Sequence, residues 1–460
     1  MSTLIDELVA KARAAQAVID SWPQEKLDLM IAAVGWETYK QAAAIAKLAI
    51  EETDMGVYEH KKLKHEKKTL GTLRDLQGVK TTGLIEEIPE KGLLKFAKPV
   101  GVIGAITPVT NCEATLPAKA LPALKARNAI IFAPHPKAKK TARLVCESMW
   151  AGLRKVGAPL DLIQLIEEPT IDLSKELMSK VDLVIATGGG ALVKSAYSSG
   201  TPAYGVGAGN AVVIVDESAD LAGAAKKIVI GKTFDNATSC SSENSVILQA
   251  GIYNEMLADL KAEGGYMCND AERAKLQELM WPDGVHLNGA IVAKSVELIA
   301  EMAGIAIPAG TRMLMVEGKH IGSDDPFCKE KLSLVLTIWK YENFPDAIQM
   351  IADITALNGR GHSCGIHSTN EDHIRELGAK ANVSRIMVNQ SHSLGNSGNY
   401  NNGMPFTLTL GCGTWGGNIT SENIHWKHYM NITWLSKPID PVEPDQEAIF
   451  GAYWKEFGRD

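Results

Sequence analysis

From about residue 100 onwards, short apolar runs alternate with longer amphipathic segments, and this alternation constrains the fold more than any other feature. The runs VGVIGAIT, AIIFAP, LIQLI and DLVIAT are strand-like, and the segments 113–127 and 137–156 between them predict helices. Such a βαβα rhythm is typical of a doubly wound parallel sheet. We therefore expect an α/β fold whose ligands bind in the loops that follow the strands.

The rest of the chain predicts further parts around that sheet. The first 80 residues have the helical period, and the run TGLIEEIPEKGLLKFAKP predicts a hairpin at about 81–99. A second α/β pattern begins near Ala211, and 460 residues are too many for one core. We expect a first α/β domain at 1–207, a second at 208–412 and a C-terminal return at 413–460. The strand-like tail NITWLSKPI would extend the hairpin, in the same subunit or in a neighbour.

Composition excludes several classes of partner. The net charge of −7 is mild and gives no basic face for nucleic acid. No apolar run approaches the roughly 20 residues of a membrane span, and the N-terminus is amphipathic rather than leader-like. We expect a cytoplasmic protein whose partner is a small molecule or another protein, and not nucleic acid or a membrane.

Among the seven cysteines, Cys240 has unusual neighbours. The seven lie far apart without a C-x-x-C pair, which argues against structural zinc and against a disulfide framework. Cys240 lies within FDNATSCSSENS, where a core thiol would bring serine and glutamate into the interior without partners. A nucleophile is the better interpretation. Asn111, in the loop TPVTN after a strand, could supply an amide donor for the resulting oxyanion.

Two loops predict a nucleotide site. ATGGGALVKSAY follows a strand and opens a helix, so its glycines allow close approach of a pyrophosphate, although they could also make only a tight turn. In APHPKAKK, the lysines could meet a ribose or a 2′-phosphate, or could simply begin a solvated helix.

The late segment NQSHSLGNSGNYNNG, residues 389–403, is dense in neutral donors. It is either a flexible surface loop or part of a pocket for a polar or anionic substrate. The histidines at 362, 367, 392, 425 and 428 lack the spacing of a helical metal site, so we expect no metal and interpret them as polar lining.

Five motifs in order resemble the aldehyde dehydrogenase family, and its CoA-acylating branch in particular. They are the glycine turn, the Asn111 loop, the Cys240 segment, EKLSLVL at 330–336 and TLTLGCGTWGGN at 407–418. The resemblance covers nearly the whole chain. It implies a Rossmann-type cofactor domain, an α/β catalytic domain and a small oligomerisation hairpin, assembled as a homodimer or homotetramer.

The resemblance also implies roles for individual residues. Cys240 would attack the aldehyde, Asn111 and the Cys240 N–H would form the oxyanion hole, and Glu330 would hold the nicotinamide ribose. The cofactor-binding set is Thr107, Pro108, His135, Pro136, Lys137, Thr187, Gly188, Gly189, Gly190, Val206, Glu330 and Leu332.

One departure from the wider family indicates the chemistry. Hydrolytic members keep a glutamate that activates water at the position of Val206. Valine cannot take a proton, so the acyl-enzyme should wait for the thiol of coenzyme A. The reaction implied is aldehyde, CoA and NAD(P)+ to acyl-CoA and NAD(P)H, with the basic cluster after Pro136 favouring NADP over NAD. Thioester exchange is nearly isoenergetic, so the reaction should be reversible and ping-pong.

The tail motif looks most like enzymes of short aldehydes with a charged end. We expect sulfoacetaldehyde, with succinate semialdehyde or acetaldehyde and propanal as alternatives. The substrate-binding residues expected are His392, Asn396, Asn402 and Thr409, with the first three as sulfonate donors. Two other interpretations remain: hydrolytic oxidation with Glu243 as base, and a catalytically silent nucleotide-binding assembly protein.

Overall fold

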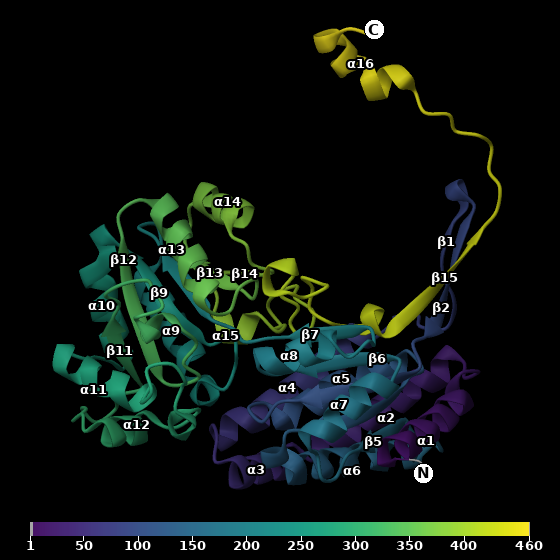
Figure 1. Ribbon diagram of the computed structural model, residues 1–460, viewed down its shortest axis with the longest axis horizontal. Helices are drawn as coiled ribbons and strands as arrows, with labels where there is room; N and C mark the ends of the chain where they lie inside the picture. The colour runs from purple at the N-terminus through teal and green to yellow at the C-terminus, as the bar shows by residue number, and fades with distance from the viewer. Residues whose placement is uncertain (1–2, 460) are drawn as a thin grey trace.

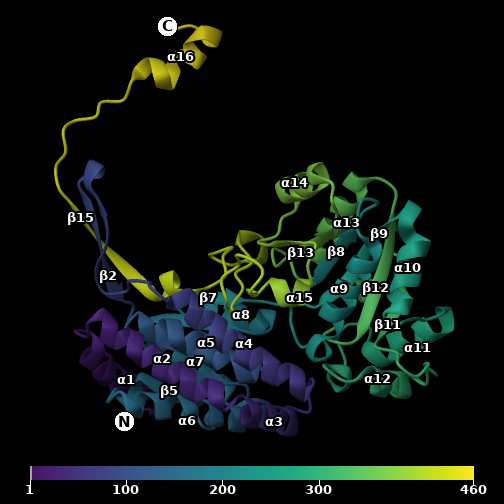
Figure 2. The same cartoon turned by 180° about the vertical axis from the view of Figure 1, so that it is seen from behind.

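The structure, a computed structural model, describes residues 3–459. Figure 1 shows two α/β bodies side by side, a narrow sheet that projects from the first body, and a C-terminal tail that leads away from both. The opposite view in Figure 2 shows the same arrangement. The segments predicted to be helices therefore lie in different layers from the segments predicted to be strands.

Four helices form the N-terminal layer, as the helical period predicts. The first is stabilised by a capping box, in which Thr3 accepts from the Asp6 N–H and Asp6 accepts from that of Thr3. Their buried apolar side chains join the core of the first sheet. The helices are α1 (Leu4–Ile19), α2 (Gln24–Lys40), α3 (Ala42–Thr53) and α4 (Tyr58–Leu76).

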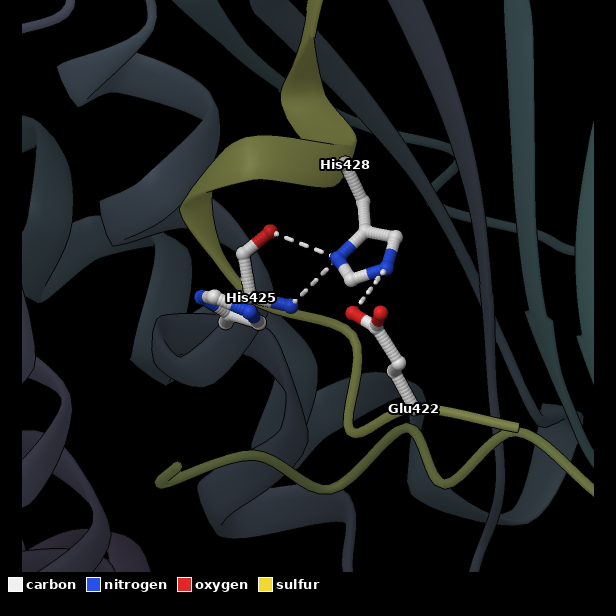
Figure 3. Close-up of side chains that lie close together, drawn as sticks. All are labelled: Glu422, His425 and His428. Carbon is white, nitrogen blue, oxygen red and sulfur yellow. Dashed lines mark hydrogen bonds and ion pairs between the residues drawn. The ribbon is translucent and has the colours of Figure 1, made fainter. Parts of the chain in front are cut away.

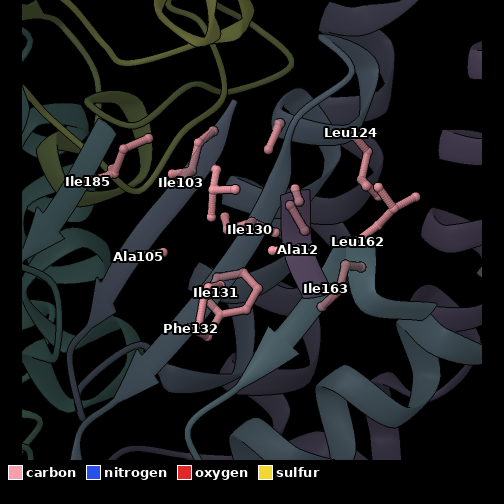
Figure 4. Packing of buried hydrophobic residues seen from close by; sticks show 14 of the residues in the cluster. Ala12, Ile103, Ala105, Leu124, Ile130, Ile131, Phe132, Leu162, Ile163 and Ile185 are labelled. Atoms are coloured by element: carbon pink, nitrogen blue, oxygen red, sulfur yellow. The ribbon is translucent and has the colours of Figure 1, made fainter. Parts of the chain in front are cut away.

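The first sheet is parallel and has the order β5-β4-β3-β6-β7. Ile103, Ile131 and Ile185 on its central strands are fully buried between helices (Figure 4). The order of strands reverses beside β3, which creates a switch point at the carboxyl ends of β3 and β6. The strands are β3 (Val102–Thr107), β4 (Ala129–Pro134), β5 (Ile163–Leu165), β6 (Leu183–Thr187) and β7 (Ala203–Val206), and the helices are α5 (Cys112–Lys125), α6 (Lys139–Lys155), α7 (Ile171–Lys180) and α8 (Gly190–Tyr197).

The second sheet is also parallel and has the order β10-β11-β12-β9-β8-β13-β14. Two apolar clusters are associated with it. The strands are β8 (Ala211–Val215), β9 (Glu243–Gln249), β10 (Gly265–Met267), β11 (Met313–Glu317), β12 (Val335–Tyr341), β13 (Cys364–His367) and β14 (Ile386–Val388). The helices are α9 (Leu221–Thr233), α10 (Tyr253–Ala262), α11 (Asp270–Met280), α12 (Val296–Ala303), α13 (Phe344–Leu357), α14 (Glu371–Lys380) and α15 (His392–Gly395).

The third sheet contains the predicted hairpin. Strands β1 (Gly83–Ile88) and β2 (Leu93–Pro99) are antiparallel, and Gly92 between them has a φ of 63°, which favours glycine. The tail strand β15 (Met430–Ser436) pairs with β2 of the same chain, so the structure decides between the two partners left open by the sequence. The final helix, α16 (Gln446–Phe457), has no buried residue.

The expected domain division stays a prediction. Of the predicted boundaries, residue 207 falls between the last strand of the first sheet and the first strand of the second. Within residues 3–459, no helix is both long and apolar enough to cross a membrane.

Candidate active site

A cavity of about 630 Å³ lies where the two parallel sheets face each other. The first sheet contributes loops that follow β3, β4 and β6, and the second contributes loops that precede β8, β9 and β12. The cavity therefore joins the carboxyl edge of one sheet to the amino edge of the other.

Most of the predicted nucleotide residues line this cavity: Thr107, Pro108, His135, Pro136, Thr187, Gly188 and Gly189. Lys137 and Gly190 are exposed and lie outside its wall, although the Lys137 N–H donates to His135 Nδ1 at 3.1 Å. Val206 is buried at the end of β7 and does not line the cavity, whereas the next residue, Gly207, does.

The N-terminus of α8 is suited to bind a phosphate group. Gly189 caps the helix without a side-chain hydrogen bond, so the first backbone N–H groups are not satisfied by the cap. A Cβ added to Gly189 would meet no atom within 4 Å, which leaves the backbone open to a ligand. These features fit the pyrophosphate of a dinucleotide.

Cys240 lies in the loop before β9 and lines the cavity between Ser239 and Ser241. The other six cysteines are buried, whereas Cys240 is only partly so. Burial of the sulfur raises the pKa of Cys240 to about 12, and the charge of Glu330 adds to that rise. In the absence of ligands the side chain is therefore a thiol, and catalysis requires its deprotonation.

Asn111 lies at the N-terminus of α5 and lines the same cavity. Its amide oxygen accepts a hydrogen bond from Lys64 Nζ at 2.7 Å. Because the oxygen is occupied, the Nδ2 group is the part of the amide left to donate. One of its N–H groups makes only a long contact, of 3.5 Å, with Thr110 Oγ1.

A buried group of four charges, which we call the α4 charge cluster, lies behind Asn111. It consists of Lys61, Lys64, Glu113 and Asp235. Lys64 Nζ lies 2.8 Å from Glu113 Oε1 and 2.5 Å from Asp235 Oδ2, while Lys61 Nζ lies 3.2 Å from Asp235 Oδ2. Burial would raise the pKa of Asp235, but the two ammonium groups lower it overall. The cluster joins α4 and α5 to the loop that carries Cys240.

That loop has an unusual backbone. Asp235, Asn236 and Ala237 all have positive φ values, of 51°, 50° and 61°. Such conformations cost roughly 1–3 kcal/mol each for residues other than glycine and persist only where the surroundings hold them. Asp235 is held by the lysines and by the Val57 N–H, which donates to its Oδ1 at 2.8 Å. The sequence gives no signal for these lysines, because the charged run YEHKKLKHEKK looks like a solvated helix.

Glu330 and Leu332 line the cavity as predicted by position. Glu330 Oε1 accepts from the Gly209 N–H at 3.2 Å. Burial raises the pKa of Glu330 to about 8, so the carboxyl is largely protonated at neutral pH.

The four predicted substrate residues do not line the cavity. His392 Nδ1 contacts Ser241 O at 2.7 Å, the Asn396 amide donates to Ser241 Oγ at 2.8 Å, and the Asn402 amide donates to Gln390 Oε1 at 2.8 Å. Thr409 is buried. The amide donors of Asn396 and Asn402 are used inside the protein, whereas His392 Nε2 and Thr409 Oγ1 are buried without a hydrogen-bond partner. Besides Asn111, the cavity wall includes hydroxyl groups from Thr110, Thr115, Thr238, Ser239, Ser241 and Ser397.

Glu243, the alternative base for hydrolysis, is also outside the cavity wall. Its Oε1 accepts from the His392 N–H at 2.8 Å, and its carboxyl packs against Gly231 on α9. The structure thus does not bring it to the position of a water that attacks at Cys240.

One group with metal-ligating atoms lies far along the chain, shown in Figure 3. Ligand atoms of Glu422, His425 and His428 lie within 4.8 Å of one another, and His428 Nε2 is 3.3 Å from Glu422 Oε2. Lys427 Nζ lies 2.5 Å from the same oxygen and already balances its charge. None of the three lines the cavity, so the group has no part in the site.

Comparisons with known proteins agree with this geometry. The model described as "Aldehyde dehydrogenase family" matches residues 2–276. A protein of Acholeplasma sp named sulfoacetaldehyde dehydrogenase is 49% identical over 98% of this chain and 95% of its own. One of Bilophila wadsworthia named sulfoacetaldehyde dehydrogenase (acylating) is 48% identical over 99% of both.

The crystal structure of an acetylating aldehyde dehydrogenase from Geobacillus thermoglucosidasius has a TM-score of 0.93. It is 36% identical and covers 96% of this chain and 98% of its own. These matches confirm the fold class and the acylating branch that the motifs predict. The chain belongs to the aldehyde dehydrogenase family, and it is an acylating aldehyde dehydrogenase.

Proposed function

We propose that this enzyme oxidises sulfoacetaldehyde to sulfoacetyl-CoA through a thioester on Cys240, with NADP or NAD as hydride acceptor. The observation that carries the proposal is the composition of one cavity. Its wall contains a partly accessible cysteine and loops suited to bind a phosphate group, and it contains no evident general base that could activate a water molecule. Val206 replaces the carboxylate expected of hydrolytic relatives. Glu330, the one carboxyl group in the described cavity wall, is protonated below about pH 8.

The residues of the chain support each step of a thioester mechanism. The Cys240 thiol releases its proton to water, the thiolate adds to the aldehyde carbon as the C=O π bond breaks, and the alkoxide that forms is held by Asn111 Nδ2 and the Cys240 N–H. The nicotinamide, when bound, supplies the acceptor for the hydride that leaves this carbon. The Thr107, His135 and Gly189 loops and Glu330 would hold the dinucleotide. CoA thiol then takes the acyl group, and the common cavity provides its path to the sulfur.

The choice of aldehyde rests on the character of the wall near Cys240. Six hydroxyl groups from Thr and Ser line that part of the cavity, together with Leu408 and Leu410. Thr115 already donates to Asn111 O and Thr238 to Asp235 Oδ2. The remaining hydroxyls can donate to a sulfonate or a carboxylate, whereas an unsubstituted aldehyde such as propanal offers them no such acceptor. Succinate semialdehyde is the runner-up because it also carries an anionic end. NADP is proposed over NAD because the exposed Lys137, beside His135, could meet the 2′-phosphate of NADP.

A substrate panel tests the function. Sulfoacetaldehyde, succinate semialdehyde, acetaldehyde and propanal are each assayed with CoA and either nicotinamide cofactor. We expect the highest kcat/KM with sulfoacetaldehyde, no sustained turnover without CoA, and a loss of at least about 1,000-fold in Cys240→Ala. Preference for propanal would reject the anionic substrate, and full-rate formation of free acid without CoA would establish hydrolysis instead. Ordinary turnover in Cys240→Ala would remove the thiol from the mechanism.

We also propose that the enzyme is a homodimer or homotetramer that assembles through the third sheet and the tail. Most side chains on β15 are exposed, and Trp434 is 56% so. On α16, Ile449, Phe450, Tyr453 and Phe457 are exposed as well. Apolar surface of this extent is typical of an interface. A monomer in light scattering, unchanged by removing residues 437–460, would contradict it.

A further inference from the structure

Helix α4 carries three buried lysines at positions that share one face. Lys61, Lys64 and Lys68 are 0%, 6% and 6% exposed. The first two belong to the α4 charge cluster, in which two carboxylates balance two ammonium groups. Lys68 differs from them, because its hydrogen-bond partners are all neutral.

The Lys68 ammonium contacts the segment that begins at Ser397. Its Nζ donates to Ser397 Oγ at 2.7 Å, to Ser397 O at 2.8 Å and to Gly398 O at 3.0 Å. The charge of Asp75 raises the pKa of Lys68, but the Asp75 carboxylate forms its ion pair with Arg74. Burial, together with the charges of Lys67 and Lys64, lowers the pKa of Lys68 to about 7. A counter-charge is therefore lacking at this position.

Ser397 connects this ammonium to the substrate cavity. It lines the same cavity as Cys240 and Asn111, while Lys68 lies behind the wall. Because Lys68 donates to the serine oxygen, the serine proton is left to donate elsewhere, and the adjacent positive charge strengthens that donor. Ser397 also lies within the segment 389–403 where the sequence predicts substrate donors.

We propose that Lys68 and Ser397 form the subsite for the anionic end of the aldehyde, with Ser397 as the contact and Lys68 as the charge behind it. This rests on the proposed function and names the residues that give its preference for an anion. A sulfonate at Ser397 supplies the counter-charge that Lys68 lacks, and the low-dielectric surroundings make their attraction strong. An uncharged aldehyde gains nothing from Lys68, so the pair discriminates between the two classes.

The test compares an anionic with an uncharged aldehyde in matched variants. In Lys68→Met, kcat/KM for sulfoacetaldehyde should fall roughly 10- to 100-fold, mainly through KM, while that for propanal changes less than about threefold. Ser397→Ala keeps both carbonyl acceptors of Lys68 and should lower the sulfoacetaldehyde value by roughly three- to tenfold. The kcat/KM of the double variant for sulfoacetaldehyde should lie within about threefold of that of Lys68→Met, because the two residues act together.

Lys62→Met is the control. Lys62 is an exposed lysine on α4 that pairs with Glu66, and its substitution should leave both substrates unaffected. An equal loss with both aldehydes in Lys68→Met would mean that the lysine only holds the 397–398 backbone, which overturns the proposal. No loss with either would overturn it too. If Lys68→Met does not fold, Ser397→Ala alone decides by the same ratio.

These outcomes are separate from those of the proposed function. A wild-type enzyme that prefers propanal rejects the anionic substrate itself. A wild-type enzyme that prefers sulfoacetaldehyde, with the same preference in Lys68→Met and Ser397→Ala, rejects only this subsite.

Discussion

The two parallel sheets present opposite ends to the same cavity. The first sheet offers the carboxyl ends of β3, β4 and β6, and its contribution includes the backbone of small residues such as Gly188 and Gly189. The second sheet offers the amino ends of β8, β9 and β12, which bring Cys240 and Glu330. The glycine turn thus comes from the first sheet and the nucleophile from the second, while Asn111 from the first and Glu330 from the second also face the cavity.

The loops at the two sheet edges that face the cavity also differ in what holds them in place. At the first edge, free N–H groups of a helix terminus bind anions without any special side chain. The loops before β9 have no such general property. The Cys240 loop instead depends on Asp235 and on lysines that reach it from α4. The first edge depends on a helix terminus, and the second depends on a cluster of buried charges.

The sharpest test of the comparison is the loss of Lys64. Lys64→Met should lower kcat/KM roughly 10- to 100-fold, because the Asn111 amide loses the partner that orients it. In an Asn111→Ala background the same substitution should add less than about threefold, as a double-mutant cycle would show. The rate of the hydride-transfer burst is the measurement.

Lys62→Met serves as the control, because Lys62 is an exposed lysine on the same helix that pairs with Glu66. Full additivity of Lys64→Met and Asn111→Ala would show that Lys64 acts on stability alone, as would a parallel loss of cofactor affinity.

A smaller effect is expected at the first edge. Gly189→Val should fold normally, because its φ of −66° and ψ of 162° suit valine and the new Cβ meets nothing within 4 Å. The side chain would block the approach of the pyrophosphate, so KM for the nicotinamide cofactor should rise about tenfold. Iodoacetamide labelling of Cys240 should stay unchanged. Gly190→Ala, just outside the cavity wall, is the matched control, and equal effects of the two would contradict a phosphate site at Gly189.

The smallest effect concerns pH at the second edge. Glu330 ionises as pH rises through about 8, and its charge then raises the pKa of Cys240. Glu330→Gln removes that charge, so above pH 8 its Cys240 should be alkylated roughly threefold faster than in the wild type. Below pH 7 both carboxyl and amide are neutral, and the rates should agree. The measurement is the alkylation rate of Cys240, corrected for labelling of the other cysteines by means of Cys240→Ala. A ratio of Glu330→Gln to wild-type rates that stays constant across pH would refute the prediction.

Local patterns in the sequence point to residues that line the cavity. The glycine run after DLVIAT places Gly188 and Gly189 there, as expected of a turn between a strand and a helix. Cys240 is partly exposed, unlike the other six cysteines, although Ser241, Ser242 and Glu243 beside it are buried, which their polar character does not predict. The substrate residues are harder, because donor density in 389–403 does not show which side chains turn inward. His392 and Asn396 are buried there, and Ser397 reaches the cavity.

By itself, the sequence determined the α/β architecture, the cysteine and the glycine turn, since each depends on neighbours along the chain. Only the tertiary structure decided that α4 buries Lys61, Lys64 and Lys68. Helical periodicity shows which residues share a face, but not what covers that face. Here part of the cover is Asp235, which lies 171 positions from Lys64 in the chain. For Lys61 and Lys64, burial depends on this distant carboxylate, which balances their charge, and for Lys68 it depends on the Ser397 and Gly398 oxygens.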